Sequence, residues 1–437
     1  MKRGTHFILI LSLLVSAAAA QKRSAGSKAS PLDAEKLIAL KVTGTTRYTD
    51  KEILAASGLL LGQKAADGDF REAARRLGDS GMFSDVAYSF SSSGGGTKLE
   101  LQLTDVEPDK LIPANFENFA WFTDAELFSE LQQRVPLFKR EVPLAGTLPD
   151  SIEDALQAML DQRQIPARVD YLRESPQEGR KILGISYSVE SLEIRIRNVE
   201  FPGATPDLLP GLQAASRRLT GVLYVRTTLA KVAEVDFLPV CFQRGYLRAS
   251  FGKADARVVS QANGKVDVDA IIPVSAGKVY STSGIEWKGN AAIATSEVAP
   301  LLHLTPGQPA DAVRLVRDID SVAKLYRSRG YMAIQIKPDV QFDDGKSGVH
   351  YDVNVVEGDV YKMGELEING LDTQAKARMQ EAWTLREGQP YNADYPKKFL
   401  DDTRQLLPRG VQWAVSVHET PDVKDKIVDV EVRFKQQ

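Results

Sequence analysis

The sequence has little of what many enzymes and small secreted proteins depend on. It contains one cysteine and four histidines among 437 residues. The single cysteine, Cys241, excludes an intramolecular disulfide. Cys241 lies in an apolar run, which favours a small buried side chain over a redox role. The fold must therefore be stabilised by packing.

Catalytic motifs are missing as well, since the sequence has no H-E-x-x-H, G-x-S-x-G, P-loop or C-x-x-C pattern. His303, His350 and His418 fall at unrelated places and are interpreted as structural residues. The glycine run at 94–96 lies between two predicted strands, which indicates a hairpin loop and not a phosphate site. We expect no enzyme activity, no metal ion, no cofactor and no small-molecule substrate.

Neither sign of charge dominates. The chain has 55 Lys and Arg against 58 Asp and Glu, for a net charge of -3. No basic surface for nucleic acid is therefore predicted. The first twenty residues combine basic Lys2 and Arg3, an apolar stretch from Phe7 to Val15, and small residues at 18–20, which is typical of a secretory signal peptide. The alternative interpretation of these twenty residues is an uncleaved membrane anchor. The polar segment 21–35 is predicted to be a flexible leader.

A three-residue pattern, which we call the repeat mark, returns about every 82 residues and follows an amphipathic helical stretch each time. A β-rich stretch comes after it, so Gly81, Gly245, Gly330 and Gly410 are predicted to end helices with positive φ. Five marks predict five repeats. The marks are Ser80-Gly81-Met82, Arg163-Gln164-Ile165, Arg244-Gly245-Tyr246, Arg329-Gly330-Tyr331 and Arg409-Gly410-Val411.

The fourth repeat shows the order of elements most clearly. A short strand and a first helix precede a longer helix from Asp311 to Arg329, in which apolar residues recur at helical spacing. The period then becomes two, and an Asp-Gly turn separates strands at 332–342 and 348–357. The order β-α-α-β-β predicts an α+β fold, with each repeat a three-stranded sheet carrying two helices on one face.

Local signals in the other repeats agree with this order. Capping boxes at Thr49–Glu52 and Thr123–Glu126 begin the first helices of repeats one and two. Hairpin turns are predicted at Asn263-Gly264 in repeat three and at Pro421-Asp422 in repeat five. Repeat two is the most divergent, with Gln164 in its mark. The repeats are expected at 36–107, 110–190, 192–276, 278–358 and 360–437.

These features together resemble a known family. The element order, the repeat mark, the links Leu304–Pro309 and Leu385–Pro390, and the joint Val356–Tyr361 are similar to POTRA (polypeptide-transport-associated) domains of the BamA/TamA-type outer-membrane assembly family. In that family the array leads into a C-terminal β-barrel, which this chain is expected to lack. A barrel-less relative and the N-terminal fragment of a barrel-containing assembly protein both fit that expectation.

The resemblance implies a non-enzymatic array in the periplasm of a Gram-negative cell envelope, with an association with the outer membrane. Its partners would be unfolded outer-membrane proteins or a separate membrane barrel, and its role would be support of outer-membrane protein assembly. The alternative function is a structural docking scaffold of the envelope.

The resemblance also implies where partners bind. The first strand after each mark would be an open sheet edge, to which an extended polypeptide adds by β-augmentation. The joint between repeats four and five would involve Glu357, Gly358 and Tyr361. The candidate edge residues are Asp255, Ala256, Arg257, Val258 and Val259 in repeat three, and Asp85, Val86, Tyr88 and Phe90 in repeat one.

An elongated chain follows from five repeats that each bury their own small core. A compact globule of 437 residues would have a radius of gyration of about 22 Å. We expect small-angle X-ray scattering of the mature protein to give a clearly larger value. A value close to that of the compact globule would contradict the repeat organisation.

Overall fold

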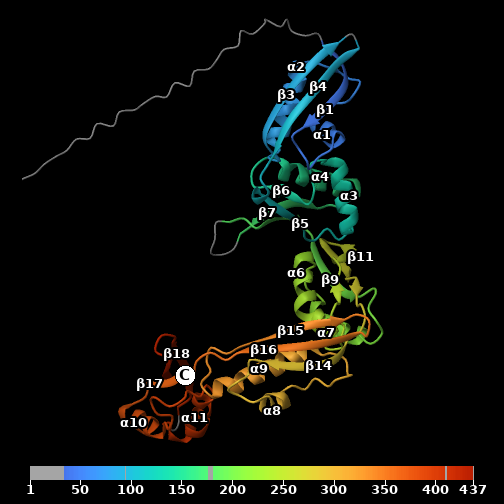
Figure 1. Cartoon of the computed structure of the whole chain (residues 1–437). Helices are drawn as coiled ribbons and strands as arrows, with labels where there is room; N and C mark the ends of the chain where they lie inside the picture. The colour runs from blue at the N-terminus through green and yellow to red at the C-terminus, as the bar shows by residue number, and fades with distance from the viewer. Residues whose placement is uncertain (1–33, 94, 176–180, 409–410, 437) are drawn as a thin grey trace, which may run out of the picture. The chain divides into compact units, whose positions relative to one another are not determined.

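The computed structural model describes residues 34–93, 95–175, 181–408 and 411–436. Figure 1 shows the elements in chain order. The predicted signal peptide, most of the predicted leader and Gly410 lie outside the described residues. Among the residues that are described, no helix has both the length and the apolar character needed to cross a membrane.

The chain divides into two compact units, and the division passes through the second repeat. The first unit contains residues up to Ala114 together with Glu130–Met159 and Arg173–Ile185. The second contains Asn115–Ser129, Leu160–Leu172 and the chain from Ser186 onward.

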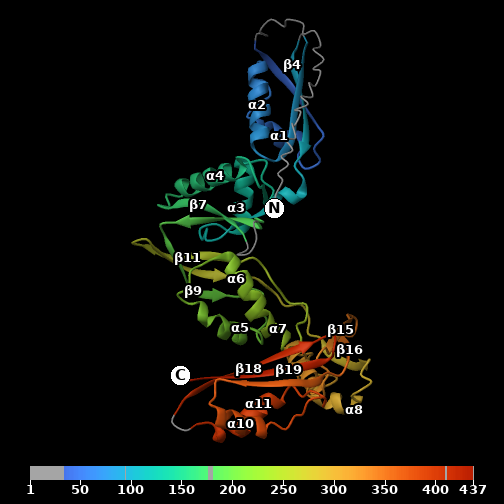
Figure 2. The same ribbon diagram turned by 90° about the vertical axis from the view of Figure 1, so that its left-hand side faces the viewer.

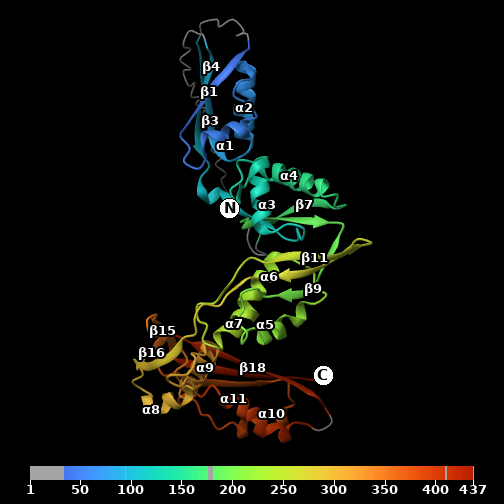
Figure 3. The same cartoon turned by 90° about the vertical axis from the view of Figure 1, so that its right-hand side faces the viewer.

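Repeat one consists of one sheet and two helices. Its elements are β1 (Glu35–Thr43), α1 (Asp50–Ser57), β2 (Lys64–Ala65), α2 (Asp67–Asp79), β3 (Phe83–Ser93) and β4 (Gly96–Asp105). The Thr49 amide donates to the Glu52 carboxylate at 2.8 Å, and the Thr49 hydroxyl accepts from the Glu52 amide, so the predicted capping box is confirmed. In Figure 3 both helices lie on the same side of β1, β3 and β4.

Repeat two is less regular. Its elements are η1 (Pro108–Lys110), β5 (Leu111–Phe116), α3 (Asp124–Arg134), β6 (Glu141–Pro143), α4 (Leu148–Gln162), β7 (Arg168–Glu174) and β8 (Gly184–Glu190). The second predicted capping box is also present, because the Thr123 amide donates to the Glu126 carboxylate at 2.8 Å. Gln164 has a φ of 55°. It therefore adopts the left-handed conformation that glycine adopts in the other described marks.

Repeat three has a long irregular helix before its hairpin. Its elements are β9 (Glu193–Glu200), α5 (Leu209–Ser216), η2 (Arg217–Leu219), α6 (Arg226–Val232), the π-helical segment η3 (Ala233–Phe237), α7 (Leu238–Phe242), β10 (Ser250–Phe251), β11 (Asp255–Ala262), β12 (Lys265–Ile271) and β13 (Val274–Ser275). Asn263 and Gly264 both have positive φ, 51° and 76°, which confirms the predicted hairpin turn.

Repeat four follows the predicted pattern closely. Its elements are β14 (Ser281–Lys288), α8 (Thr295–Val298), η4 (Ala299–Leu301), α9 (Ala312–Ser328), β15 (Gln335–Asp343) and β16 (Gly348–Val356). The Asp311 carboxylate caps α9 by accepting from the Arg314 amide at 2.8 Å. The apolar face of α9 is buried in the core at Leu315, Val322 and Tyr326.

Repeat five contains β17 (Lys362–Asn369), α10 (Thr373–Ala382), α11 (Tyr395–Thr403), η5 (Arg404–Leu406), β18 (Trp413–Asp422) and β19 (Ile427–Gln436). The turn predicted at Pro421-Asp422 is wrong, because both residues belong to β18 and Asp422 pairs with Ile427. Proline is tolerated there because β18 is an edge strand. Figure 2 shows α10 and α11 along one face of β18 and β19.

The last three repeats share one sheet topology. Their strand orders are β11-β12-β9, β14-β16-β15 and β17-β19-β18. In each, the central strand is parallel to the first strand and antiparallel to its hairpin partner. The predicted three-stranded α+β repeat is therefore observed. The first two sheets, β2-β1-β4-β3 and β6-β5-β8-β7, have a fourth short strand, because a segment after the first helix pairs with β1 or β5.

The described glycines of the repeat marks have the predicted positive φ, at 79° for Gly81, 81° for Gly245 and 93° for Gly330. They also connect repeats. The Gly245 carbonyl accepts from the Tyr280 amide, and the Gly330 carbonyl accepts from the Tyr361 amide, both at 2.8 Å. Each of these two glycines is therefore both a helix end and the attachment point of the following repeat.

The space around Gly330 explains why a larger residue is excluded. A Cβ atom there would lie 2.9 Å from the Tyr361 carbonyl oxygen and 2.9 Å from Val360 Cγ1. Gly307 in the same repeat also has positive φ, at 81°, but a Cβ atom there would meet nothing within 4 Å. Alanine at Gly307 therefore destabilises the fold through the backbone conformation alone. Alanine at Gly330 also crowds the residues at the joint, so comparing the two variants distinguishes the two effects.

We expect Gly330→Ala to lower the free energy of unfolding by on the order of 1–3 kcal/mol, and Gly307→Ala by less. Both variants place a side chain at positive φ, but only Gly330→Ala also crowds the next repeat. Urea unfolding followed by tryptophan fluorescence measures both losses. Equal losses would contradict a role of Gly330 at the joint.

Candidate functional site

The first strand of the β-hairpin after each repeat mark lies at one end of its sheet. This holds for β3, β7, β11, β15 and β18. A strand at the end of a sheet has a neighbour on one side only, so alternate backbone N–H and C=O groups point away from the sheet. The five repeats therefore present the same kind of edge at the same place in their topology.

The opposite end of each sheet is different, because a segment of the same repeat pairs with it. In repeats one and two this segment is β2 or β6. In repeats three to five it is a single bridge from the link after the first helix, at Leu223, Pro309 or Pro390. Each sheet thus has one edge met by its own chain and one edge formed by the strand after the mark.

The candidate residues of repeat three all lie on β11. Asp255, Ala256, Arg257 and Val258 pair with β12, and the register shifts at Val259. The shift marks a bulge, which locally disturbs the alternation of backbone groups. The candidate strand is therefore regular only before Val259 and again toward the hairpin turn.

Residues of repeat two contact both ends of β11 within the second unit. The Trp121 indole N–H donates to Gln261 Oε1 at 3.2 Å. The Asp124 amide donates to Asp255 Oδ1 at 2.9 Å, and Lys253 Nζ lies 3.1 Å from Asp124 Oδ1. These contacts use side chains of β11, and they leave less room for an incoming strand than the sheet order alone suggests.

Arg226, at the start of α6, holds the segment that makes these contacts. Its side chain is 9% exposed and its guanidinium lies 3.6 Å from Asp255 Oδ1. It donates to five oxygens, namely Tyr224 Oη at 3.2 Å, Ala254 O at 3.1 Å, Phe116 O and Phe119 O at 3.4 Å, and Phe122 O at 2.5 Å. A buried arginine satisfied in this way fixes residues 116–122 to repeat three.

Glu117 adds a second buried polar contact at the same place. Its carboxylate accepts from the Thr227 hydroxyl at 2.7 Å and from the Thr227 amide at 3.2 Å. Neither Arg226 nor Glu117 is among the residues predicted from the sequence. The contacts of Arg226 with Phe116, Phe119 and Phe122 go to backbone carbonyls 104 to 110 positions away, and such contacts leave no pattern in a sequence.

The candidate residues of repeat one lie on β3. The Tyr88 hydroxyl donates to Asp67 Oδ1 at 2.9 Å, and the ring centroids of Phe90 and Phe70 are 5.2 Å apart. Val86 is half-buried, whereas Asp85 is exposed. Alternate side chains of β3 therefore contact α2 or are half-buried. The groups of β3 that remain for a partner are chiefly backbone N–H and C=O groups.

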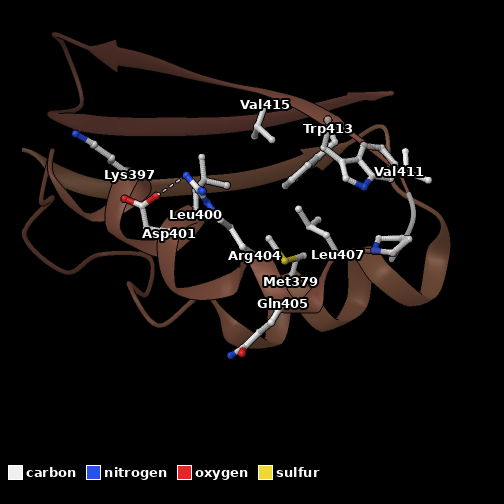
Figure 4. A pocket seen from close by; sticks show the side chains of 12 residues that line it. Met379, Lys397, Leu400, Asp401, Arg404, Gln405, Leu407, Val411, Trp413 and Val415 are labelled. Carbon is white, nitrogen blue, oxygen red and sulfur yellow. Dashed lines mark hydrogen bonds and ion pairs between the residues drawn. The ribbon is translucent and has the colours of Figure 1, made fainter. Parts of the chain in front are cut away.

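In repeat five a hollow lies between α11 and the edge strand β18. Its volume is about 800 Å³, and apolar side chains of Leu400, Leu407, Trp413 and Val415 line it beside the Asp401–Arg404 ion pair (Figure 4). Trp413 Nε1 is buried and has no hydrogen-bond partner among the described residues. A hollow of this kind beside an open edge can receive the side chain of an added strand.

Of the three predicted joint residues, Glu357 and Gly358 end repeat four, and Tyr361 attaches repeat five to it through the Gly330 carbonyl. Glu357 Oε1 accepts from the Tyr326 hydroxyl at 2.9 Å and from the Ala292 amide at 2.8 Å. Gly358 has a φ of 72°, and Tyr361 is buried. Burial and the hydrogen bond to Glu357 raise the pKa of Tyr326, so its hydroxyl stays protonated.

Cys241 is fully buried in the core of repeat three. Burial raises the pKa of its thiol to about 11. The thiolate is the reactive form of cysteine, so this thiol is unreactive near neutral pH.

Parts of the chain are similar to known proteins. Residues 280–358 match the POTRA family model, described as a surface antigen variable number repeat. The crystal structure of Haemophilus influenzae BamA POTRA3-5 is 19% identical with a TM-score of 0.42, and the match covers 56% of this chain and 96% of that one. POTRA1-3 of the periplasmic domain of Omp85 from Anabaena is 17% identical with a TM-score of 0.25, covering 56% and 95%. The N-terminal domain of Omp85 from Thermosynechococcus elongatus is 19% identical with a TM-score of 0.24, covering 56% and 97%.

The matched segment contains the whole of repeat four, from Tyr280 to the end of β16. Repeats three and five have the same strand order and the same attachment of first strand to last strand. Repeat four therefore has the POTRA fold, and repeats three and five share its sheet topology.

We expect Arg226→Met to lower the free energy of unfolding by about 2–4 kcal/mol, because several buried carbonyls lose their donor. Arg257→Met is the matched control, since Arg257 is half exposed and the buried Asp269 keeps its second partner, Arg197, when Arg257 is lost. Hydrogen exchange at residues 116–122 should rise only in Arg226→Met. Equal exchange in the two variants would contradict the role assigned to Arg226.

Proposed function

We propose that this chain is a non-enzymatic periplasmic array that binds unfolded or partner polypeptides by strand addition and so supports outer-membrane protein assembly. The observation that carries the proposal is the repeated open edge. Five sheets place the strand after the mark at an end, while the other end meets a segment of the same repeat.

Strand addition suits clients of many sequences. An added strand is held by backbone hydrogen bonds, which every residue except proline can donate. Each contributes only about 0.5–1.5 kcal/mol net, so one short edge binds weakly. Several edges on one chain raise the effective concentration of a long unfolded client, and weak contacts then add up to useful affinity.

The hollow of repeat five supports a degree of side-chain selection. Alternate side chains of an added strand point to the same face of the sheet. One apolar side chain of a client paired with β18 would enter the hollow near Leu407 and Trp413. Repeat five therefore favours clients whose strands carry large apolar residues at every second position, as barrel strands do.

The POTRA match supports the cellular setting. The related Haemophilus structure is named as BamA, and the Anabaena structure is described as part of a periplasmic domain. An exported chain, as residues 1–20 predict, would meet unfolded outer-membrane proteins in that compartment. A separate membrane barrel is the other partner that this setting offers.

A docking scaffold for one folded partner is the second candidate, and two observations favour it. Pro338 and Pro421 lie within the edge strands β15 and β18, where each removes one backbone donor. Residues 121–124 contact both ends of β11. These features reduce the number of edge backbone groups that a client strand could pair with. The side-chain surfaces of the repeats remain available to a folded partner.

Proline substitution on β11 tests the mechanism. Arg257→Pro and Val258→Pro should differ, because only one of two neighbouring amides points away from the sheet. We expect one variant to lose binding of a labelled, unfolded barrel-strand peptide while remaining folded, and the other to unfold. Fluorescence anisotropy measures binding and circular dichroism measures folding.

Arg257→Ala is the control for loss of the side chain and should bind as the parent protein does. Matching proline pairs on β3 and β18 extend the test to repeats one and five. If every folded proline variant binds the peptide as tightly as the parent protein, strand addition is wrong and the scaffold function is favoured.

A further inference from the structure

The sheet of repeat four has a polar face opposite its helices. Along β16, Val349, Tyr351 and Val353 are buried in the apolar core with α9. Because side chains of a strand alternate between faces, His350 and Asp352 lie on the other face. Glu286 on β14 pairs in register with Asp352 and completes the group.

These three residues bring metal-ligating atoms together. One ligand atom from each of Glu286, His350 and Asp352 lies within 4.8 Å of the other two. His350 Nε2 is 3.5 Å from Asp352 Oδ1, which is long for a hydrogen bond. The imidazole thus faces the carboxylate without a close bond to it.

Asp352 is held in position by a neighbour on the third strand. Gln341 Nε2 on β15 donates to Asp352 Oδ2 at 2.6 Å. The side chain of Asp352 is only 10% exposed. Carboxylates that bind metals are commonly oriented by an outer hydrogen bond of this kind, which leaves the second oxygen for the ion.

Gly284 makes room for the imidazole. It pairs with His350, and a Cβ atom at this position would lie 2.9 Å from His350 Nδ1. Its φ is outside the left-handed region, so the backbone conformation does not require glycine. The missing side chain therefore serves the placement of the His350 ring.

Lys288 is the cation that now neutralises the group. Its Nζ lies 3.1 Å from Asp352 Oδ2 and 4.0 Å from Glu286 Oε2. The side chain is about half exposed, so it can turn to solvent when another cation arrives. Competition with Lys288 would limit the affinity of any metal ion.

We propose that Glu286, His350 and Asp352 form a binding site for a divalent transition-metal ion, of which Zn²⁺ is the best representative. One imidazole nitrogen with two carboxylates suits zinc better than calcium or magnesium, which prefer oxygen ligands alone. Bonds of about 2.0–2.2 Å require the three side chains to close by rotamer changes, with water in the remaining position.

The test is a titration of the full mature chain with Zn²⁺, followed by calorimetry. His350→Ala should weaken binding at least tenfold, and Glu286→Gln should weaken it less. Lys288→Met should strengthen binding several-fold, because it removes the competing ammonium group. The nuclear magnetic resonance signal of the His350 ring should shift on addition of zinc.

His418→Ala is the matched control, since His418 also lies opposite a carboxylate, Glu431, on a neighbouring strand. It should bind zinc as the parent protein does, and circular dichroism should show that all variants are folded. The proposal is overturned if zinc binds no more tightly than about 1 mM, or if His350→Ala binds as the parent protein does. Binding of Ca²⁺ with the same affinity as zinc would also overturn it.

Discussion

The same backbone hydrogen bond is found at both joints between the last three repeats, and it ties each sheet to the repeat before it. The amide of Tyr280 or Tyr361, just before a first strand, donates to the carbonyl of the glycine that ends the preceding helix. The geometry requires positive φ at that glycine and leaves no space for a Cβ atom. The start of one sheet is therefore attached to the helix end of the repeat before it.

The same topology sets which sheet edge stays open. The link after the first helix turns back onto the first strand, so that side of the sheet meets its own chain. The hairpin strand after the mark is left at the other side. A single folding pattern, repeated five times, thus produces five similar edges whose differences lie in side chains, such as the hollow beside β18 and the contacts of Trp121 with β11.

Much of the fold could be predicted because its signals are local. Helix α9, both capping boxes and the Asn263-Gly264 turn depend on residues a few positions apart, and the structure confirms them. The Pro421 turn was misplaced because proline suits both a turn and an edge strand. Arg226 and the group around His350 could not be found, because their partners come from distant strands and loops that only the tertiary fold brings together.

The two prolines in edge strands have a consequence for the chain at high concentration. A protein that offers several open edges to others also offers them to copies of itself, and identical edges pair readily into growing sheets. Pro338 and Pro421 interrupt two of these edges, and the bulge at Val259 bends a third. A long flexible segment can bind on either side of such interruptions, whereas a rigid matching edge cannot. If strand addition is the function, these irregularities disfavour pairing between identical edges more than pairing with a flexible client.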